Sequence, residues 1–244
     1  MTDEQLRALE RQWLKSRSVE DEALFLAERL RQGELPPERL QLAACCGHRA
    51  AALACHAPPA GHLLPQVAKS SWWTRRLKTG DFAQGMSFEP SGAVLGRLLL
   101  ALALYLQPRF EHSHQGDLRP RRAIGLACAY FEAAPVDAEA LKTSAQECRR
   151  AASWEFARGD ELARAIHHTA GEACQSVRFV LGQSELPVDI VTLRHGLLYV
   201  ANCVGLGAIE AALSADFLSW LLAPASEDHW GSGGTEATMP GGAT

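Results

Sequence analysis

Apolar residues recur along this chain at intervals of three and four positions, which is the spacing of one face of an α-helix. The residues before position 57 show this pattern in short segments, and those after position 91 show it in long ones. We find no convincing alternation of apolar and polar residues, the pattern that is typical of a half-buried β-strand. The pattern therefore predicts an all-α protein.

Residues 1–56 predict a small N-terminal helical module. Ser18 can cap a helix because its hydroxyl accepts a hydrogen bond from a free amide of the first turn. Gly33 can end that helix because glycine adopts the left-handed conformation without strain. The expected helices of this module cover 3–16, 18–33, 38–46 and 49–55.

The rest of the chain divides into three parts. Residues 57–92 are rich in proline and glycine, and they predict a linker or an irregular arm. Residues 91–223 predict a multi-helix bundle, on which the N-terminal module packs. Its expected helices cover 93–110, 118–134, 137–158, 160–181, 187–203 and 208–222. Residues 224–244 are rich in Gly, Ser, Thr and Ala, so we expect a disordered tail.

Three helices of the bundle give specific expectations about burial. The helix over 93–110 is apolar almost all round, which places it at the centre of the core. In the helix over 160–181, we expect one of His167 and His168 near the apolar edge and the other outside. The helix over 137–158 should turn one stripe inward, formed by Leu141, Ala145, Cys148, Ala152 and Phe156.

The composition narrows the classes of function. A formal net charge of −4 and a pI near 6.1 argue against a general nucleic-acid binder. The polar, acidic start of the chain does not look like a signal peptide, and the longest apolar run, Leu98 to Leu106, is too short to span a bilayer. We therefore expect a cytoplasmic protein. Most of its cysteines lie on apolar helix faces and are expected to be buried thiols.

The most distinctive stretch covers 117–124 and reads Asp-Leu-Arg-Pro-Arg-Arg-Ala-Ile. Its proline suits the first turn of a helix, and Asp117 can accept hydrogen bonds from the first free amides. Positive charge at a helix N-terminus opposes the macrodipole, so some of Arg119, Arg121 and Arg122 serve another purpose. Two interpretations stay open: ion pairs within the protein, or a patch that binds an acidic partner or a phosphate.

A second basic group, Lys69 to Lys78, surrounds two tryptophans in the irregular arm. Such a group suits single-stranded nucleic acid, but Trp and Arg are also enriched among hot spots of protein interfaces. The net negative charge favours a protein partner. We expect one indole to pack between the two modules and the other to be exposed. The candidate partner-binding residues are Trp72, Trp73, Arg75, Arg76, Arg119, Arg121 and Arg122.

Metal and catalytic sites have simpler explanations. His112 and His114 could hold a metal with Asp117, or they could lie in a solvated loop. No nucleophile elbow, phosphate-binding glycine loop or His-Glu-x-x-His motif occurs. We expect no metal, no cofactor and no catalytic residue. A second possible ligand group, for which packing at a helix end is the simpler explanation, comprises Cys45, Cys46, His48, Cys55 and His56.

Two stretches resemble known sequences. Residues 18–52 resemble a short helical module at the N-termini of uncharacterised bacterial proteins, through Leu-Pro-Pro-Glu-Arg at 35–39 and Gly-His-Arg-Ala-Ala at 47–51. The stretch from 117 to 131, with its Asp-x-Arg-Pro-Arg and the alanine-rich helices that follow, resembles the all-α immunity proteins of bacterial polymorphic-toxin systems. That resemblance implies a cytoplasmic protein that binds and blocks a toxin, without chemistry of its own. It does not extend to 187–223.

The sequence therefore predicts a non-enzymatic protein-binding module, an immunity-type inhibitor that binds and neutralises a cognate bacterial toxin. The alternative is a regulatory nucleic-acid or nucleotide-binding protein that uses the two basic groups, Arg119 to Arg122 and Lys69 to Lys78. An enzyme with a histidine-based site is the third class.

Overall fold

The computed structural model describes residues 3–55, 92–185 and 190–223. These residues form α-helices, one π-helical turn and no strand, which confirms the all-α prediction. The N-terminal helices are α1 (Asp3–Ser16), α2 (Val19–Gln32), α3 (Pro37–Cys45) and α4 (Arg49–Ala54). The others are α7 (Gly92–Ser113), α8 (Arg119–Phe131), α9 (Ala138–Arg158), α10 (Glu161–Val180), α11 (Ile190–Val204), α12 (Leu206–Ala212), the π-helical turn η2 (Leu213–Phe217) and α13 (Leu218–Leu222).

The N-terminal helices begin and end where their capping residues stand. Ser18 Oγ accepts a hydrogen bond from the Asp21 amide at 3.1 Å, and Gly33 ends α2 with a φ of 78°. His48 Nδ1 accepts from the Ala51 amide at 3.2 Å and so caps α4. These contacts are local in sequence, which is why the boundaries could be predicted.

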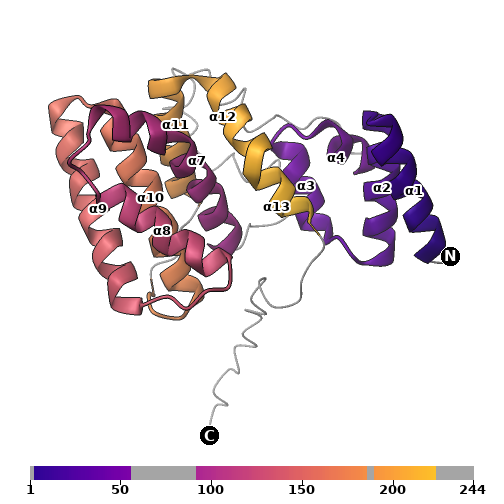
Figure 1. Ribbon diagram of the computed structural model, residues 1–244, viewed down its shortest axis with the longest axis horizontal. Coiled ribbons are helices and arrows are strands. Elements are labelled where there is room, and N and C mark those ends of the chain that lie inside the picture. Colours follow the sequence, from indigo (N-terminus) through magenta and orange to yellow (C-terminus); the bar gives the residue numbers. More distant parts are fainter. Residues whose placement is uncertain (1–2, 56–91, 186–189, 224–244) are drawn as a thin grey trace, which may run out of the picture.

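The N-terminal module packs on the rest of the protein through α13, which lies between the two parts (Figure 1). Two buried arginines of the module reach the last carbonyls of that helix. Arg29 Nη1 donates to the Leu222 carbonyl at 2.5 Å, and Arg39 Nη1 donates to the Ala223 carbonyl at 3.2 Å. Cations at a helix C-terminus stabilise its unpaired carbonyls. The predicted docking of the module on the bundle is thus confirmed.

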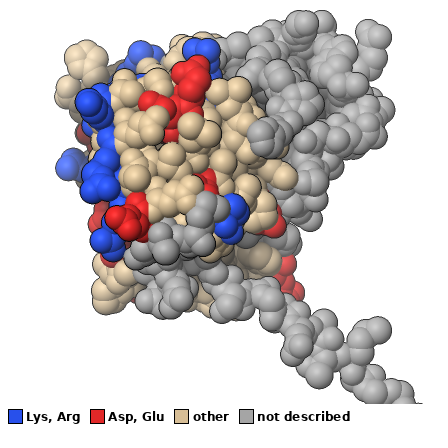
Figure 2. Space-filling view, turned by 90° about the vertical axis from the view of Figure 1, so that its right-hand side faces the viewer, with Lys and Arg blue, Asp and Glu red and all other residues tan. Residues whose placement is uncertain are grey.

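The outer end of the N-terminal module carries charged side chains around a patch of other residues. In Figure 2, which faces this end, lysines and arginines gather along one edge, acidic side chains reach in from the top, and residues of neither charge occupy most of the centre. Within the module, the rings of Trp13 and Phe25 stack at 5.4 Å and join α1 to α2.

The bundle is built around α7 and α10, which pack on each other; α8, α9 and α11 also pack on α10 (Figure 1). By length and composition α7 could cross a membrane, but 67% of its most apolar window is buried inside the protein, as in a core helix. The crossing of α7 and α10 is close because Gly96 faces Ser176. A Cβ added at Gly96 would lie 2.5 Å from Ser176 Oγ.

Several predictions about helix detail are wrong. Helix α7 runs one turn further than expected, to Ser113, and contains Pro108. The predicted single helix over 208–222 is divided by η2. Phe156 was expected inside, but 62% of it is exposed. One of His167 and His168 was expected to lie outside, but His167 is buried and His168 is half-buried against Tyr199.

Candidate binding surface

Asp117 organises the start of α8. Its Oδ1 accepts a hydrogen bond from the Arg119 amide at 3.0 Å, so it satisfies a free amide as the sequence predicted. The same carboxylate holds the Arg119 guanidinium through Nε at 2.8 Å and Nη2 at 2.5 Å. Burial alone would raise the pKa of Asp117, but the hydrogen bonds from Arg119 and the charge of His167 lower that pKa to about 2. Asp117 is therefore ionised and fixed.

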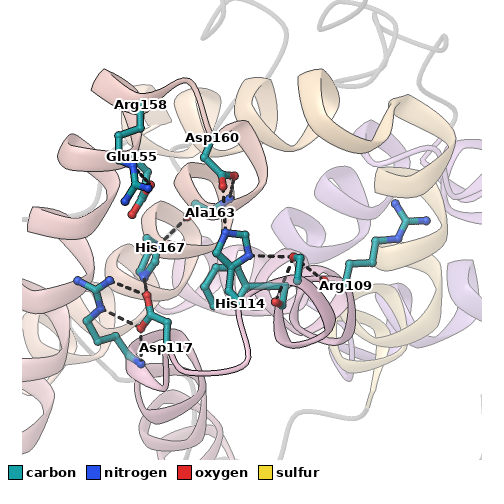
Figure 3. A network of polar contacts seen from close by, with 11 residues as sticks. Arg109, His114, Asp117, Glu155, Arg158, Asp160, Ala163 and His167 are labelled. Atoms are coloured by element: carbon teal, nitrogen blue, oxygen red, sulfur yellow. Dashed lines mark hydrogen bonds and ion pairs between the residues drawn. The ribbon is translucent and has the colours of Figure 1, made fainter.

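His167 joins this carboxylate to α10. Figure 3 shows His167 and Asp117 facing each other at one end of the bundle. The buried ring places Nδ1 2.7 Å from the Ala163 carbonyl oxygen and Nε2 3.1 Å from Asp117 Oδ2. Both neighbours are acceptors, so both contacts are favourable only when the ring carries two protons. Burial lowers the pKa of His167, whereas the Ala163 carbonyl and the Asp117 carboxylate oppose that change.

A second histidine–aspartate pair ties the same loop to the same helix. His114 Nε2 lies 2.9 Å from Asp160 Oδ2, while Asp160 Oδ1 caps α10 at the Ala163 amide at 2.9 Å. His114 also contacts Ser113 Oγ at 2.8 Å, an order of groups that is reminiscent of a hydrolytic triad. The serine hydroxyl, however, donates to the helix carbonyls of Arg109 at 3.1 Å and Phe110 at 3.3 Å. This network therefore holds the loop in place.

The other two arginines of the stretch also have partners inside the protein. Arg121 Nε lies 3.9 Å from Glu111 Oε1, and Arg122 Nη1 lies 3.6 Å from Glu147 Oε2. Each of the three arginines therefore has a carboxylate within ion-pair distance, as the first of the two interpretations expected. The ion pairs do not cover the guanidiniums, because 60% of the Arg122 side chain and 67% of the Arg121 side chain remain exposed.

An exposed tryptophan lies on α9, the helix that also carries Glu147, the partner of Arg122, and sequence reasoning missed it as a candidate. Trp154 on α9 is 65% exposed, the highest value among the large hydrophobic residues described. It lies one helical turn from Arg150 on one side and from Arg158 on the other. Glu147, the partner of Arg122, lies on the same stripe of α9, about 20° around the axis from Trp154. This places Arg122 of α8 and Trp154 of α9 along one edge.

We call this surface the α8–α9 face. The face also includes Arg119, whose guanidinium interacts with the charge of Glu155. Glu155 is 13% exposed at its side chain and lies 4.0 Å from Arg158. Figure 3 shows Glu155 and Arg158 close to His167, and the charge of Glu155 acts on that ring. The face comprises Arg119, Arg122, Glu147, Arg150, Trp154 and Arg158.

The opposite edge of α9 carries Phe156. Its ring lies 4.1 Å from the Arg164 guanidinium, whose other side lies 3.8 Å from the Tyr199 ring. Arg164 is thus held between two aromatic rings from α9 and α11. This contact explains why Phe156 points away from the core, since α10 offers it a cation at the helix edge.

The remaining sequence candidates fall into two groups. Trp72, Trp73, Arg75 and Arg76 lie outside the described residues. Two thiols of the bundle are unreactive because of their environment: burial raises the pKa of Cys148 to about 12 and raises that of Cys174 further. Within residues 3–55, 92–185 and 190–223, no three His, Cys, Asp or Glu side chains come together in a way that could hold a metal ion.

A cavity of about 760 Å³ separates α1 and α2 from α13. Its walls include Trp13, Phe25 and Leu218, together with charged groups of both signs. Two of its carboxylates have a cationic or titratable neighbour, since Glu34 lies 3.7 Å from Arg29 and Glu22 lies 3.5 Å from His48. The cavity therefore does not indicate one class of ligand.

Comparison with protein-family models, curated proteins and solved structures found no match to this chain. The feature of the molecule that bears on function is therefore the α8–α9 face, with the residues that hold it.

Proposed function

We propose that this protein is a non-enzymatic binding protein that holds another protein against its α8–α9 face. The proposal includes the partner class that the resemblance at 117–131 implies, a bacterial toxin that the protein neutralises. That partner class rests on the resemblance alone, whereas the binding face rests on the geometry.

One observation carries the proposal: Trp154 is held in the open on a rigid helix between Arg150 and Arg158. Exposing an indole to water is unfavourable, and monomeric proteins bury most large aromatic side chains. Tryptophan and arginine are also the residues that most often dominate the binding energy of protein interfaces. Helix α9 packs along α10 and α8, so the indole is presented by a fixed scaffold.

The polar network below the face supports a positioning role. Its carboxylates accept hydrogen bonds from backbone amides at 3.0 and 2.9 Å, and its serine hydroxyl donates to helix carbonyls. These hydrogen bonds close the loops that precede α8 and α10. The network thus fixes Arg119, which lies at the edge of the face.

The test is capture of a partner by the full-length protein from the source cells, followed by mass spectrometry. The baits are the wild type, Trp154→Ala and the matched control Leu24→Ala, which removes an exposed leucine of α2. We expect one partner that wild type and control retain and that Trp154→Ala retains at least about tenfold less. For the toxin partner class, the captured protein should arrest growth when expressed alone and lose that effect when co-expressed with the wild type.

Equal retention by Trp154→Ala and wild type would show that the indole is not in the interface, and it would remove the main support for this face. A partner that does not arrest growth would leave the binding face intact but would contradict the toxin assignment.

A further inference from the structure

We propose that the α8–α9 face binds an acidic protein surface, one that presents carboxylates around an apolar recess for Trp154. This inference rests on the proposed function and adds the chemistry of the partner. It comes from the arrangement of charges at this face, where the acidic side chains are more buried than the arginines they pair with.

In every ion pair of the face, the arginine is the outer member. The exposed fractions of the two side chains are 40% for Arg119 against 19% for Asp117, and 65% for Arg158 against 13% for Glu155. The pair formed by Arg122 and Glu147 shows 60% against 37%. The carboxylates lie below and the guanidiniums lie above them. A partner therefore meets positive charge, although the protein as a whole has a net charge of −4.

The outer guanidiniums keep donors for a partner. A guanidinium carries five N–H donors in a planar fork. The contacts of Arg122 and Arg158 with their carboxylates, at 3.6 and 4.0 Å, are ion pairs longer than a hydrogen bond. Carboxylates of a partner can therefore form the short, paired hydrogen bonds that the internal partners do not form.

The single exposed ring of this face favours protein over nucleic acid. Single-stranded nucleic acid is held by several aromatic rings on which successive bases stack. The face offers one ring, Trp154, which suits a single recess on a protein better than a run of bases.

The experiment measures binding of three probes to the full chain by NMR, with the indole N–H signal of Trp154 as the local reporter. The probes are a short capped peptide of glutamates around one phenylalanine, the same peptide with glutamine for glutamate, and a short oligothymidylate. The test variant is Arg122→Glu with Arg158→Glu. The control variant is Arg11→Glu with Arg31→Glu, which makes the same charge change on exposed positions of α1 and α2. Melting curves establish that both variants are folded.

We expect the glutamate peptide to bind at the face, to bind at least about tenfold more weakly to the test variant, and to be little affected by the control. Its affinity should also fall with added salt. Equal binding of the glutamine peptide would overturn the acidic partner and leave protein binding standing. Tighter binding of the oligothymidylate at the face would overturn this inference and the proposed function together. If no probe moves the Trp154 signal, the inference is wrong, and partner capture with Trp154→Ala still decides the proposed function separately.

Discussion

At the scale of single residues, Asp117 decides how the arginine stretch is arranged. One carboxylate accepts from the Arg119 amide at 3.0 Å, holds the Arg119 side chain and faces the buried ring of His167 at 3.1 Å. The main structural role of residues 117–122 is therefore to begin α8 and to close the loop before it. The outward arginines are a consequence of this arrangement, since their carboxylate partners come from the more buried side.

The first prediction is that Asp117→Asn lowers the free energy of unfolding by about 2 kcal/mol at neutral pH. The reason is linkage: the pKa of Asp117 is about 2 in the folded protein against an ordinary value of 3.8, and each pKa unit corresponds to about 1.4 kcal/mol. Urea denaturation of both proteins measures the difference. Asp137→Asn, at the exposed cap of α9, is the matched control and should cost less.

The second prediction concerns the pH dependence of that difference. A carboxylate whose pKa is lowered in the folded state stabilises the protein above its unfolded pKa, and the stabilisation is lost as pH falls through the folded pKa. The stability gap between wild type and Asp117→Asn should therefore be constant above about pH 5 and shrink between about pH 4 and pH 2. A gap that stays constant down to pH 2 would show that the carboxylate charge is not the cause.

At the scale of helices, the sequence predicted boundaries better than faces. Ser18, Gly33, Asp137 and Gly159 act within one turn of their own helices, so their caps could be read from local spacing. The orientation of Phe156 could not be predicted from local spacing, because it depends on Arg164 of the next helix. That arginine is placed only when α9 and α10 pack. Local chemistry fixes where a helix ends, and packing decides which edge of it is covered.

The candidate site follows the same division. The arginine stretch was identified from sequence because its composition is unusual. The structure shows the ion pairs of the first interpretation, and binding of a partner by the outer guanidiniums stays a prediction. Trp154 was missed because a tryptophan in an alanine-rich helix looks like a core residue. The available signal was its place about 20° from Glu147 around the helix, away from Leu141 and Cys148.

The third prediction tests the closest helix crossing. Gly96→Ala should destabilise the protein by about 1–3 kcal/mol, because the new Cβ would lie 2.5 Å from Ser176 Oγ and the helices must shift. Gly125→Ala in α8 is the control, since a Cβ there meets nothing within 4 Å and alanine favours the helix by about 1 kcal/mol. Opposite signs in thermal melting are expected. Equal effects of the two substitutions would contradict the close packing of α7 and α10.

At the scale of the whole molecule, the two helical parts are joined by charge at the end of α13. Arg29 is buried, and its Nη1 donates to the Leu222 carbonyl at 2.5 Å, so an ion of the N-terminal module caps a helix on the other side of the junction. The α8–α9 face belongs to the bundle, beyond this junction (Figure 1). The N-terminal module therefore contributes to stability without being part of the proposed interface.

The fourth prediction follows from this separation. Arg29→Leu should cost about 1.5–3 kcal/mol, because it removes a charge-assisted hydrogen bond across the junction. Amide hydrogen exchange should show lost protection first in α2 and α13, with α9 and α10 unchanged. Lys142→Leu, which removes an ion pair between two exposed side chains of α9, is the control and should cost less than about 1 kcal/mol. Uniform loss of protection in both parts would show that the junction is not a separate unit of stability.

The most direct test of the proposed binding surface is the affinity of Trp154→Ala for the captured partner, measured by calorimetry beside its melting temperature. If the α8–α9 face is the binding surface, Trp154→Ala should lose about 2 kcal/mol or more of binding free energy, which is roughly thirtyfold in affinity. Because the indole is exposed, stability should change by less than about 0.5 kcal/mol. Unchanged affinity, or a loss of affinity matched by a large drop in stability, would contradict the assignment of this face as the binding surface.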